Sequence, residues 1–329
     1  MELALLVIVV VVALGFDFTN GFHDTANAVA TSVSTRAMSP RLAVLIAAAA
    51  NLAGAFVTTA VAKTVGKGII DTGIANSRLI LAALLGAIVW NLLTWWLGLP
   101  SSSSHALIGG LIGAALAHSW TSGVKWHGLA HKVLIPATIA PALGFVAAFG
   151  LLVLLLWVFQ WAKPGPANHG FRLAQLASGT WVAFTHGAND AQKTMGVIAL
   201  ALYETGHIKE FDIPLWVKIA AGLAIGLGTY AGGWRIMRTL GSKIFKLEPA
   251  SGFAAQTAAG VTIYLATHFG YPISTTHVIS GAVMGTGATK RLSAVRWGVA
   301  GNIVVAWILT IPVSALLAAG FLKLVAPYF

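Results

Sequence analysis

The sequence predicts an all-α, polytopic membrane protein built from two inverted-topology repeats, with discontinuous or re-entrant helices. Of its 329 residues, 57% are hydrophobic and only 9% are charged, whereas about a quarter of the residues in a typical soluble domain are charged. Apolar stretches of helical length recur along the whole chain. Two unusual polar motifs each occur twice inside this apolar sequence, about half a chain length apart.

The first motif lies at residues 20–27 (NGFHDTAN) and returns at residues 186–193 (HGANDAQK). The second lies at residues 100–105 (PSSSSH) and returns at residues 272–277 (PISTTH). Both copies keep their order and nearly their spacing. Many transporters build one shared site from two such halves.

The repeats divide the chain into a first transmembrane unit at 1–160, a short cytoplasmic link at 161–172 and a second, inverted unit at 173–329. The link is basic and contains Pro164-Gly165-Pro166, which is typical of a connection. If each unit crosses the membrane five times, an odd number, the second lies upside down. An N-terminus outside places eleven basic residues inside and eight outside, the bias expected of a multi-pass protein of the cytoplasmic membrane.

The apolar segments beside the motifs are too short to cross a membrane alone. Segments 3–16 and 173–185 each run into a Gly-x-x-Asp sequence, and segments 105–117 and 277–287 each follow a proline and a hydroxyl cluster. We therefore expect helix breaks at all four places, which are tolerated where the backbone lines a cavity. Gly109 and Gly113 match Gly281 and Gly285, and each GxxxG pair favours close helix contact.

The charge and composition exclude several classes of function. The net charge is +11, but the basic residues stand singly in loops, so membrane lipid rather than nucleic acid is the expected partner. The absence of cysteine excludes disulfides, thiolate metal sites and cysteine nucleophiles. The apolar stretch after Met1-Glu2 lacks a basic leader and is interpreted as a retained membrane helix. Most of the 12 tryptophans are interpreted as packing or interface residues.

Two carboxylates stand inside apolar spans, Asp24 and Asp190. A charge at bilayer depth costs about 2.5 kcal/mol or more, so it normally faces a cavity and has a function. Three residues further on, Asn27 and Lys193 share the helix faces of these acids. The candidate residues for a coupling cation or proton are Asp24, Asn27, Asn189, Asp190 and Gln192. The alternative is that each aspartate only caps the helix after a break.

The hydroxyl clusters are the candidate anion site. A proline followed by Ser or Thr at a helix start leaves backbone N–H groups free, and the helix dipole adds about half a positive charge there. The candidate phosphate-binding residues are Ser102, Ser103, Ser104, Ser274, Thr275 and Thr276. Candidates for a proton relay or a substrate contact are His105, His277, His23 and Lys193. Ordinary N-capping and helix packing are the alternatives for these residues.

The acids also bear on which oxyanion is bound. Phosphate keeps an ionisable O–H near neutral pH and can donate it to a carboxylate, whereas sulfate has no such proton. A site built to bond a substrate hydroxyl rejects analogues that lack it. Phosphate is therefore favoured if Asp24 or Asp190 reaches the anion, and sulfate is the second choice.

Residues 21–31 (GFHDTANAVAT) and 186–193 (HGANDAQK), together with the paired Pro-(Ser/Thr)-His motifs, give the chain a family resemblance over nearly its whole length. It resembles the inorganic phosphate transporter (Pit) family, and most of all the bacterial low-affinity phosphate permeases. The resemblance implies secondary, cation-coupled uptake of inorganic phosphate by a homodimer. It implies proton coupling, with phosphate carried partly as neutral metal–phosphate complexes, whereas other members use Na⁺. It implies no bound cofactor.

Two departures from the common family motif bear on the coupling ion. The first motif has Phe22-His23 where the commoner form has Ala-Asn, and the second ends in Gln192-Lys193 where the common form ends in Asn. Replacement of a potential Na⁺ ligand by His23 favours proton coupling. The long central hydrophilic loop of many members is nearly absent here.

Two other classes of function are open to this sequence. An intramembrane serine hydrolase would use Ser104, His105 and an aspartate, but adjacent residues on a helix do not face each other. A hydrolase also needs only one nucleophile, so the duplication argues against an enzyme and no catalytic residues are assigned. An anion channel is the third reading, and uptake that cannot run against a phosphate gradient would favour it.

Overall fold

A computed structural model describes residues 2–325, and in that range the chain is helical, with one isolated β-bridge between Ile70 and Val124. The helices are α1 (Glu2–Ser34), α2 (Pro40–Gly54), α3 (Ala60–Gly68), α4 (Ser77–Leu97), α5 (Ser103–Ser119), α6 (Trp126–Leu129), α7 (Ile135–Val158), α8 (Pro164–Glu204), α9 (Leu215–Ala231), α10 (Trp234–Arg238), α11 (Pro249–His268), α12 (Thr275–Lys290) and α13 (Trp297–Val325). Five short 3₁₀ or π turns connect them, η1 (Thr72–Ile74), η2 (Trp120–Gly123), η3 (Ala130–Leu134), η4 (Thr239–Lys243) and η5 (Leu292–Ala294).

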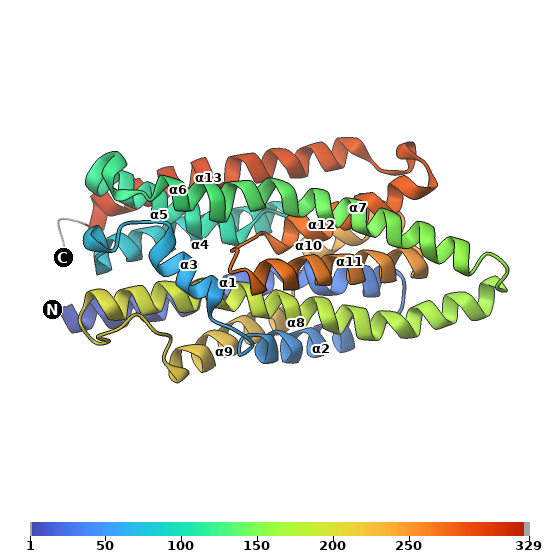
Figure 1. Cartoon of the computed structure of the whole chain (residues 1–329), viewed down its shortest axis with the longest axis horizontal. Helices are drawn as coiled ribbons and strands as arrows, with labels where there is room; N and C mark the ends of the chain where they lie inside the picture. Colours follow the sequence, from blue (N-terminus) through green and yellow to red (C-terminus); the bar gives the residue numbers. More distant parts are fainter. Residues whose placement is uncertain (1, 326–329) are drawn as a thin grey trace.

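The molecule is an elongated bundle arranged around α1 and α8. These two helices run in opposite directions along the long axis, and α1 begins at the same end at which α13 ends (Figure 1). The hairpin α4–α5 occupies that end, while α11–α12 extends toward the other (Figure 1). The tips of the two hairpins meet, because the rings of His105 and His277 lie 4.8 Å apart, centroid to centroid.

Both hairpin tips form as the proline-hydroxyl motifs predict. α4 ends at Gly98 (φ 67°) and α11 is followed by Gly270 (φ 71°), a left-handed conformation that glycine adopts without strain. Beyond each turn, a hydroxyl caps the next helix: Ser102 accepts from the His105 backbone N–H, and Ser274 from that of His277. The predicted discontinuities at the two prolines are confirmed.

The two halves pack reciprocally. α5 lies against α13 and α12 against α7, while α1 lies against α9 and α8 against α2. At these crossings a Cβ atom on Gly113 would lie 2.0 Å from the Ala315 carbonyl oxygen, and one on Gly285 would lie 2.2 Å from that of Phe145. The close contact predicted for the GxxxG pairs is confirmed, and each pair contacts the last helix of the other half.

The predicted breaks at the aspartate motifs are wrong. α1 and α8 pass through Asp24 and Asp190 without interruption. The motif glycines mark helix crossings instead: a Cβ on Gly21 would lie 2.5 Å from the Ile225 carbonyl oxygen of α9, and one on Gly187 would lie 2.1 Å from that of Asn51 in α2. A glycine in an apolar run is compatible with either a break or a close crossing.

The connection between the halves is shorter than the sequence indicated. α7 ends at Val158 and α8 begins at Pro164, so most of residues 161–172 form the first turns of α8. Proline fits there because the first turn of a helix does not use its N–H groups. The unit boundaries at 160 and 173 stay a prediction.

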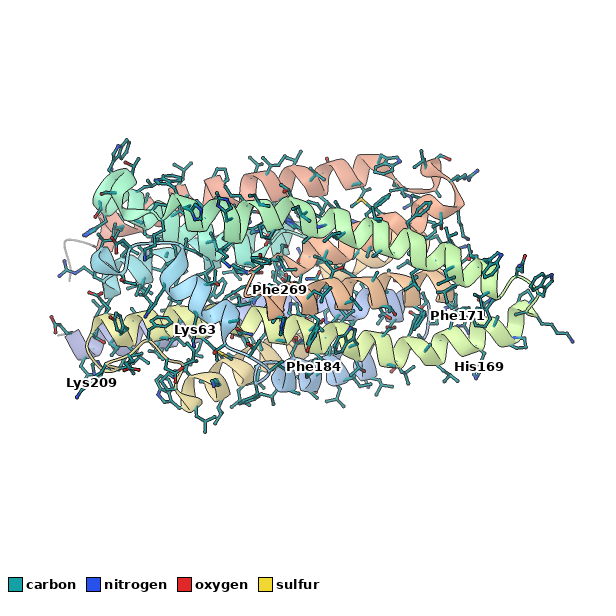
Figure 2. All side chains as sticks on the ribbon, in the orientation of Figure 1. Lys63, His169, Phe171, Phe184, Lys209 and Phe269 are labelled. Carbon is teal, nitrogen blue, oxygen red and sulfur yellow. The ribbon has the colours of Figure 1, made fainter. Side chains whose placement is uncertain are left out.

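The ionisable side chains of the two aspartate motifs face inward, and many large apolar side chains face outward. Asp24, Asp190 and Lys193 are at most 2% exposed, whereas large apolar side chains such as Val146 and Ile308 are about two-thirds exposed. Among the described residues, four helices are long and apolar enough to span a membrane, and α9 with Trp234–Lys243 makes a fifth if this pair, bent by 60°, is one span. The chain is therefore a membrane protein with several apolar helices, whose outer side chains fit lipid. Figure 2 shows Lys209 and His169 near opposite ends of the molecule.

We expect Gly285→Leu to destabilise the protein by about 1–3 kcal/mol or more, because the new side chain has no room against α7. Thermal unfolding of the purified protein in detergent measures this loss. Gly150→Leu is the matched control, since a Cβ atom at Gly150 of α7 meets nothing within 4 Å. Equal melting temperatures for both variants would contradict the close packing of α12 on α7.

Candidate functional site

The two intramembrane acids meet at the centre of the bundle through one imidazole. His186 Nε2 lies 3.9 Å from Asp24 Oδ2 and 3.4 Å from Asp190 Oδ2. One ligand atom from each of these three residues lies within 4.8 Å of the others, and all three side chains are buried. α1 and α8 run antiparallel (Figure 1), and the shared contact with His186 places these acids, 166 residues apart in sequence, side by side.

The candidate His23 and three side chains that the sequence did not single out, Thr94, Asn51 and Ser101, hold these groups in place. His23 Nδ1 lies 2.5 Å from Asp24 Oδ1, and His23 Nε2 lies 3.0 Å from the Thr94 hydroxyl on α4. His186 Nδ1 lies 2.7 Å from the Asn51 side-chain oxygen on α2. Ser101, beside the hydroxyl cluster, donates to Thr94 over 2.8 Å. The acids are thereby fixed by α2 and by the first hairpin.

The residues three positions after each acid contact the hairpin tips. Asn27 donates to the hydroxyls of Thr276 (2.8 Å) and Thr275 (3.4 Å) on α12. Lys193 donates to Asp190 (2.6 Å), to the Ile273 carbonyl (3.0 Å) and to Ser104 on α5. Each acid-bearing helix therefore reaches a tip that belongs to the opposite half. Lys193 touches both tips.

The six hydroxyl residues have two different local roles. Ser102 and Ser274 cap α5 and α12, so for these two the capping alternative describes the contact. The next two residues of each tip face the acid-bearing helices, and Ser103 donates to Asp24 over 3.5 Å. A group bound between the tips would therefore meet two helix N-termini, four hydroxyls and the acids.

The histidines that follow the clusters contact each other at the centre. His105 and His277 meet edge to face, and the Nε2 atoms of both are buried without a hydrogen-bond partner in residues 2–325. Trp307 of α13 stacks on His277 with the ring centroids 4.0 Å apart, and its indole N–H donates to the Pro100 carbonyl over 3.0 Å. Trp307 thus joins both hairpin tips, a role that the general interpretation of the tryptophans missed.

Two of the candidate residues lie beside the cluster. The Gln192 side-chain oxygen accepts from the backbone N–H groups of Val61 (2.9 Å) and Ala62 (3.2 Å), so it holds the start of α3. Asn189 donates to Thr267 and to the Tyr271 carbonyl, and its side-chain oxygen is buried without a partner in the described part of the chain. Gln192 is therefore engaged elsewhere, whereas Asn189 keeps a free oxygen.

The charges of the cluster define what it can bind. The two carboxylates and the Lys193 ammonium leave one negative charge when the histidines are neutral. Asp190 Oδ2 and Asn27 Oδ1 are buried acceptor atoms with no hydrogen-bond partner among the described residues, and His186 Nε2 is buried without one as well. One further proton or small cation would balance the charge of this cluster, and buried charge is tolerated only when it is balanced.

Comparisons with known proteins bear on the family and the fold of the chain. A family model described as "Phosphate transporter family" matches residues 20–166 and 160–318. A probable low-affinity inorganic phosphate transporter of Rhizobium meliloti (strain 1021) is 51% identical over 317 residues, covering 96% of this chain and 95% of the relative. Its counterpart in Bacillus subtilis (strain 168) is 45% identical over 320 residues, covering 96% of both chains. A solved structure titled "The sodium-dependent phosphate transporter" has a TM-score of 0.91 and 27% identity, covering 99% of this chain and 100% of that one.

Proposed function

This chain belongs to the phosphate transporter family, and we propose that it takes up inorganic phosphate across the cytoplasmic membrane by symport with protons. Its relatives are named as transporters, and it is a membrane transporter rather than an enzyme. The serine hydrolase pattern of Ser104, His105 and an aspartate is not assembled as a hydrogen-bonded set in the described residues. The Ser104 hydroxyl accepts from Lys193 rather than from a histidine.

The observation that supports the proposal most strongly is that both aspartates lie at the hairpin tips. Asp24 contacts the first tip through Ser103, and Asp190 is joined to both tips through Lys193. Phosphate would lie between the starts of α5 and α12, where backbone N–H groups and the hydroxyls of Ser103, Ser104, Thr275 and Thr276 can donate to its oxygens. Asp24 or Asp190 would accept the proton that hydrogen phosphate carries. Sulfate lacks that proton, so the acids would discriminate against it.

Alternating access is supported by the arrangement of the hairpins. The cluster is buried, with Asp24, Ser104 and Thr276 at most 2% exposed, so this conformation closes the site on both sides. The hairpins approach it from different ends of the bundle (Figure 1). Movement of one hairpin would open one side while the other stays closed, as in transporters with inverted repeats.

Protons rather than Na⁺ are favoured by the charges already present. The Lys193 ammonium is a tethered cation at the position that matches Asn27, and it pairs with Asp190. Asp24 faces His23 and His186, and an imidazole is a common proton shuttle in proteins. A sodium ion at Asp190 would have to displace the ammonium. We further propose that the transporter works as a homodimer and carries part of its phosphate with a divalent metal, as the family resemblance implies.

Uptake of labelled phosphate into proteoliposomes, with pH and Na⁺ gradients imposed separately, tests this function. We expect a pH gradient, acidic outside, to drive accumulation above the external concentration, and a Na⁺ gradient alone to drive none. An excess of sulfate should leave the rate unchanged. Accumulation on a Na⁺ gradient alone would reverse the choice of coupling ion, and movement only down the phosphate gradient would indicate a channel.

A further inference from the structure

α1 carries a second buried acid that the transport site does not use. Asp17 lies two helical turns before Asp24, is 0% exposed, and has neither carboxyl oxygen in a hydrogen bond with any residue in 2–325. It stands in the middle of a helix long and apolar enough to span the membrane. Acids at such depth are costly and normally functional.

Polar side chains surround this level of the bundle, and they also lack partners. Asn20 and Thr194 are the neutral polar groups that interact most directly with the Asp17 carboxyl group. The Asn20 and Thr194 side-chain oxygens are buried without hydrogen bonds within the described chain. Asn91 of α4 is equally unpaired. Asn91 precedes Thr94 by one helical turn, and Asn20 precedes His23 by one turn. Because His23 and Thr94 are hydrogen-bonded, Asn91 and Asn20 are expected at the same level of the bundle.

Two charged side chains of α8, those of Asp190 and Lys193, act electrostatically on Asp17, and both belong to the transport site. The titratable residues of α4 and α9 are Arg78, Lys218 and Tyr230, which are half-buried or exposed and therefore face away. The hairpin tips, α10 and α11 contact α1 at Phe22 and at later residues. These contacts lie more than one helical turn beyond Asp17.

We propose that Asp17 is the binding site of the coupling proton, which it exchanges with the end of the bundle at which α1 begins. A carboxylate in this position has no cation or donor bonded to it, whereas the neutral acid can be buried at far lower cost. The closed conformation described here is thus the proton-loaded state. The inference rests on the proposed proton symport and adds a residue to it.

The neighbouring charge favours a proton over a sodium ion at this position. A sodium ion bound at Asp17 would keep its charge close to the Lys193 ammonium, which would repel it. A proton needs only one carboxyl oxygen. Seven residues of helix place Asp17 about 10 Å from Asp24 along the axis. Asn20 of α1 and Lys193 of α8 interact with the Asp17 carboxyl group, and Lys193 also contacts Asp190 and Ser104, so these two side chains supply polar groups through which a proton can pass to the phosphate site.

Asp17→Asn tests the assignment because asparagine keeps the size and the neutrality of the protonated acid. Proteoliposomes with the variant would be assayed for phosphate accumulation under a pH gradient. They would also be assayed for exchange of labelled against unlabelled phosphate at equal pH on both sides. We expect accumulation to be lost, while exchange and the melting temperature stay close to those of the wild type. Asp71→Asn is the matched control, since Asp71 caps an exposed turn.

Each other result overturns the proposal. Accumulation by Asp17→Asn would show that the coupling proton binds elsewhere, and loss of exchange by a folded variant would place Asp17 in the anion site. A large fall in melting temperature would show that the group is charged in this conformation. The wild-type protein in the same vesicles distinguishes a failure of the Asp17 assignment from a failure of proton symport itself. If it does not accumulate phosphate on a pH gradient, proton symport itself fails.

Discussion

Asp24→Asn and Asp190→Asn are each expected to abolish gradient-driven phosphate accumulation. Asparagine cannot take up a proton or accept the phosphate hydroxyl as a carboxylate does. Asp190→Asn also leaves the buried Lys193 ammonium without its counter-ion, and breaking a buried pair in this way costs about 3–5 kcal/mol. Labelled phosphate uptake into proteoliposomes under a pH gradient measures both effects.

The same two variants should also lose phosphate exchange at equal pH, because Asp24 contacts the first hairpin tip through Ser103 and Asp190 holds Lys193, which contacts both tips. This loss distinguishes them from Asp17→Asn, for which exchange is expected to persist. Asp71→Asn again controls for the chemical change. Wild-type accumulation by both Asp24→Asn and Asp190→Asn would remove the acids from the coupling mechanism.

Lys193→Asn is expected to stop uptake in Na⁺-free medium and to make it respond to added Na⁺. The substitution removes the tethered ammonium from Asp190 and gives the second acid-bearing helix the residue that Asn27 supplies on the first. A buried carboxylate without a cation is costly, so a soluble cation gains a favourable site there. Initial uptake rates at constant pH, with Na⁺ varied against choline, measure the response.

Lys209→Asn is the control for Lys193→Asn, because Lys209 is exposed near one end of the molecule (Figure 2). It should transport as the wild type does, with no response to Na⁺. Undiminished, Na⁺-independent uptake by Lys193→Asn would show that the ammonium does not serve as the cation of this half.

Duplication is the reason why much of the site could be predicted from the sequence. Asp24 and Asp190 stand out because the same polar pattern surrounds both, and the structure brings them together. The hydroxyl clusters were recognisable for the same reason, and the proline in each marks a true helix start. The pattern did not distinguish Ser102 and Ser274, which cap helices, from the hydroxyls beside them. That distinction depends on which way a side chain points in the first turn.

Residues that occur once were harder to recognise. Asp17, Asn51 and Trp307 have no marked counterpart in the other half, and each lies in an apolar helix where a single polar group is compatible with many roles. The helix breaks predicted at Gly21 and Gly187 were wrong because glycine permits both a break and a close crossing. Only the neighbouring helices, α9 and α2, decide between the two. Such contacts join segments far apart in the chain, and local sequence does not encode them.

The crossed packing of α5 on α13 and of α12 on α7 has a consequence for assembly. A chain cut between α7 and α8 would expose Gly109 and Gly113 in one piece and Gly281 and Gly285 in the other, because the helices that cover them lie across the cut. Neither piece could bury its own hairpin, so we expect the two to reach a stable fold only together.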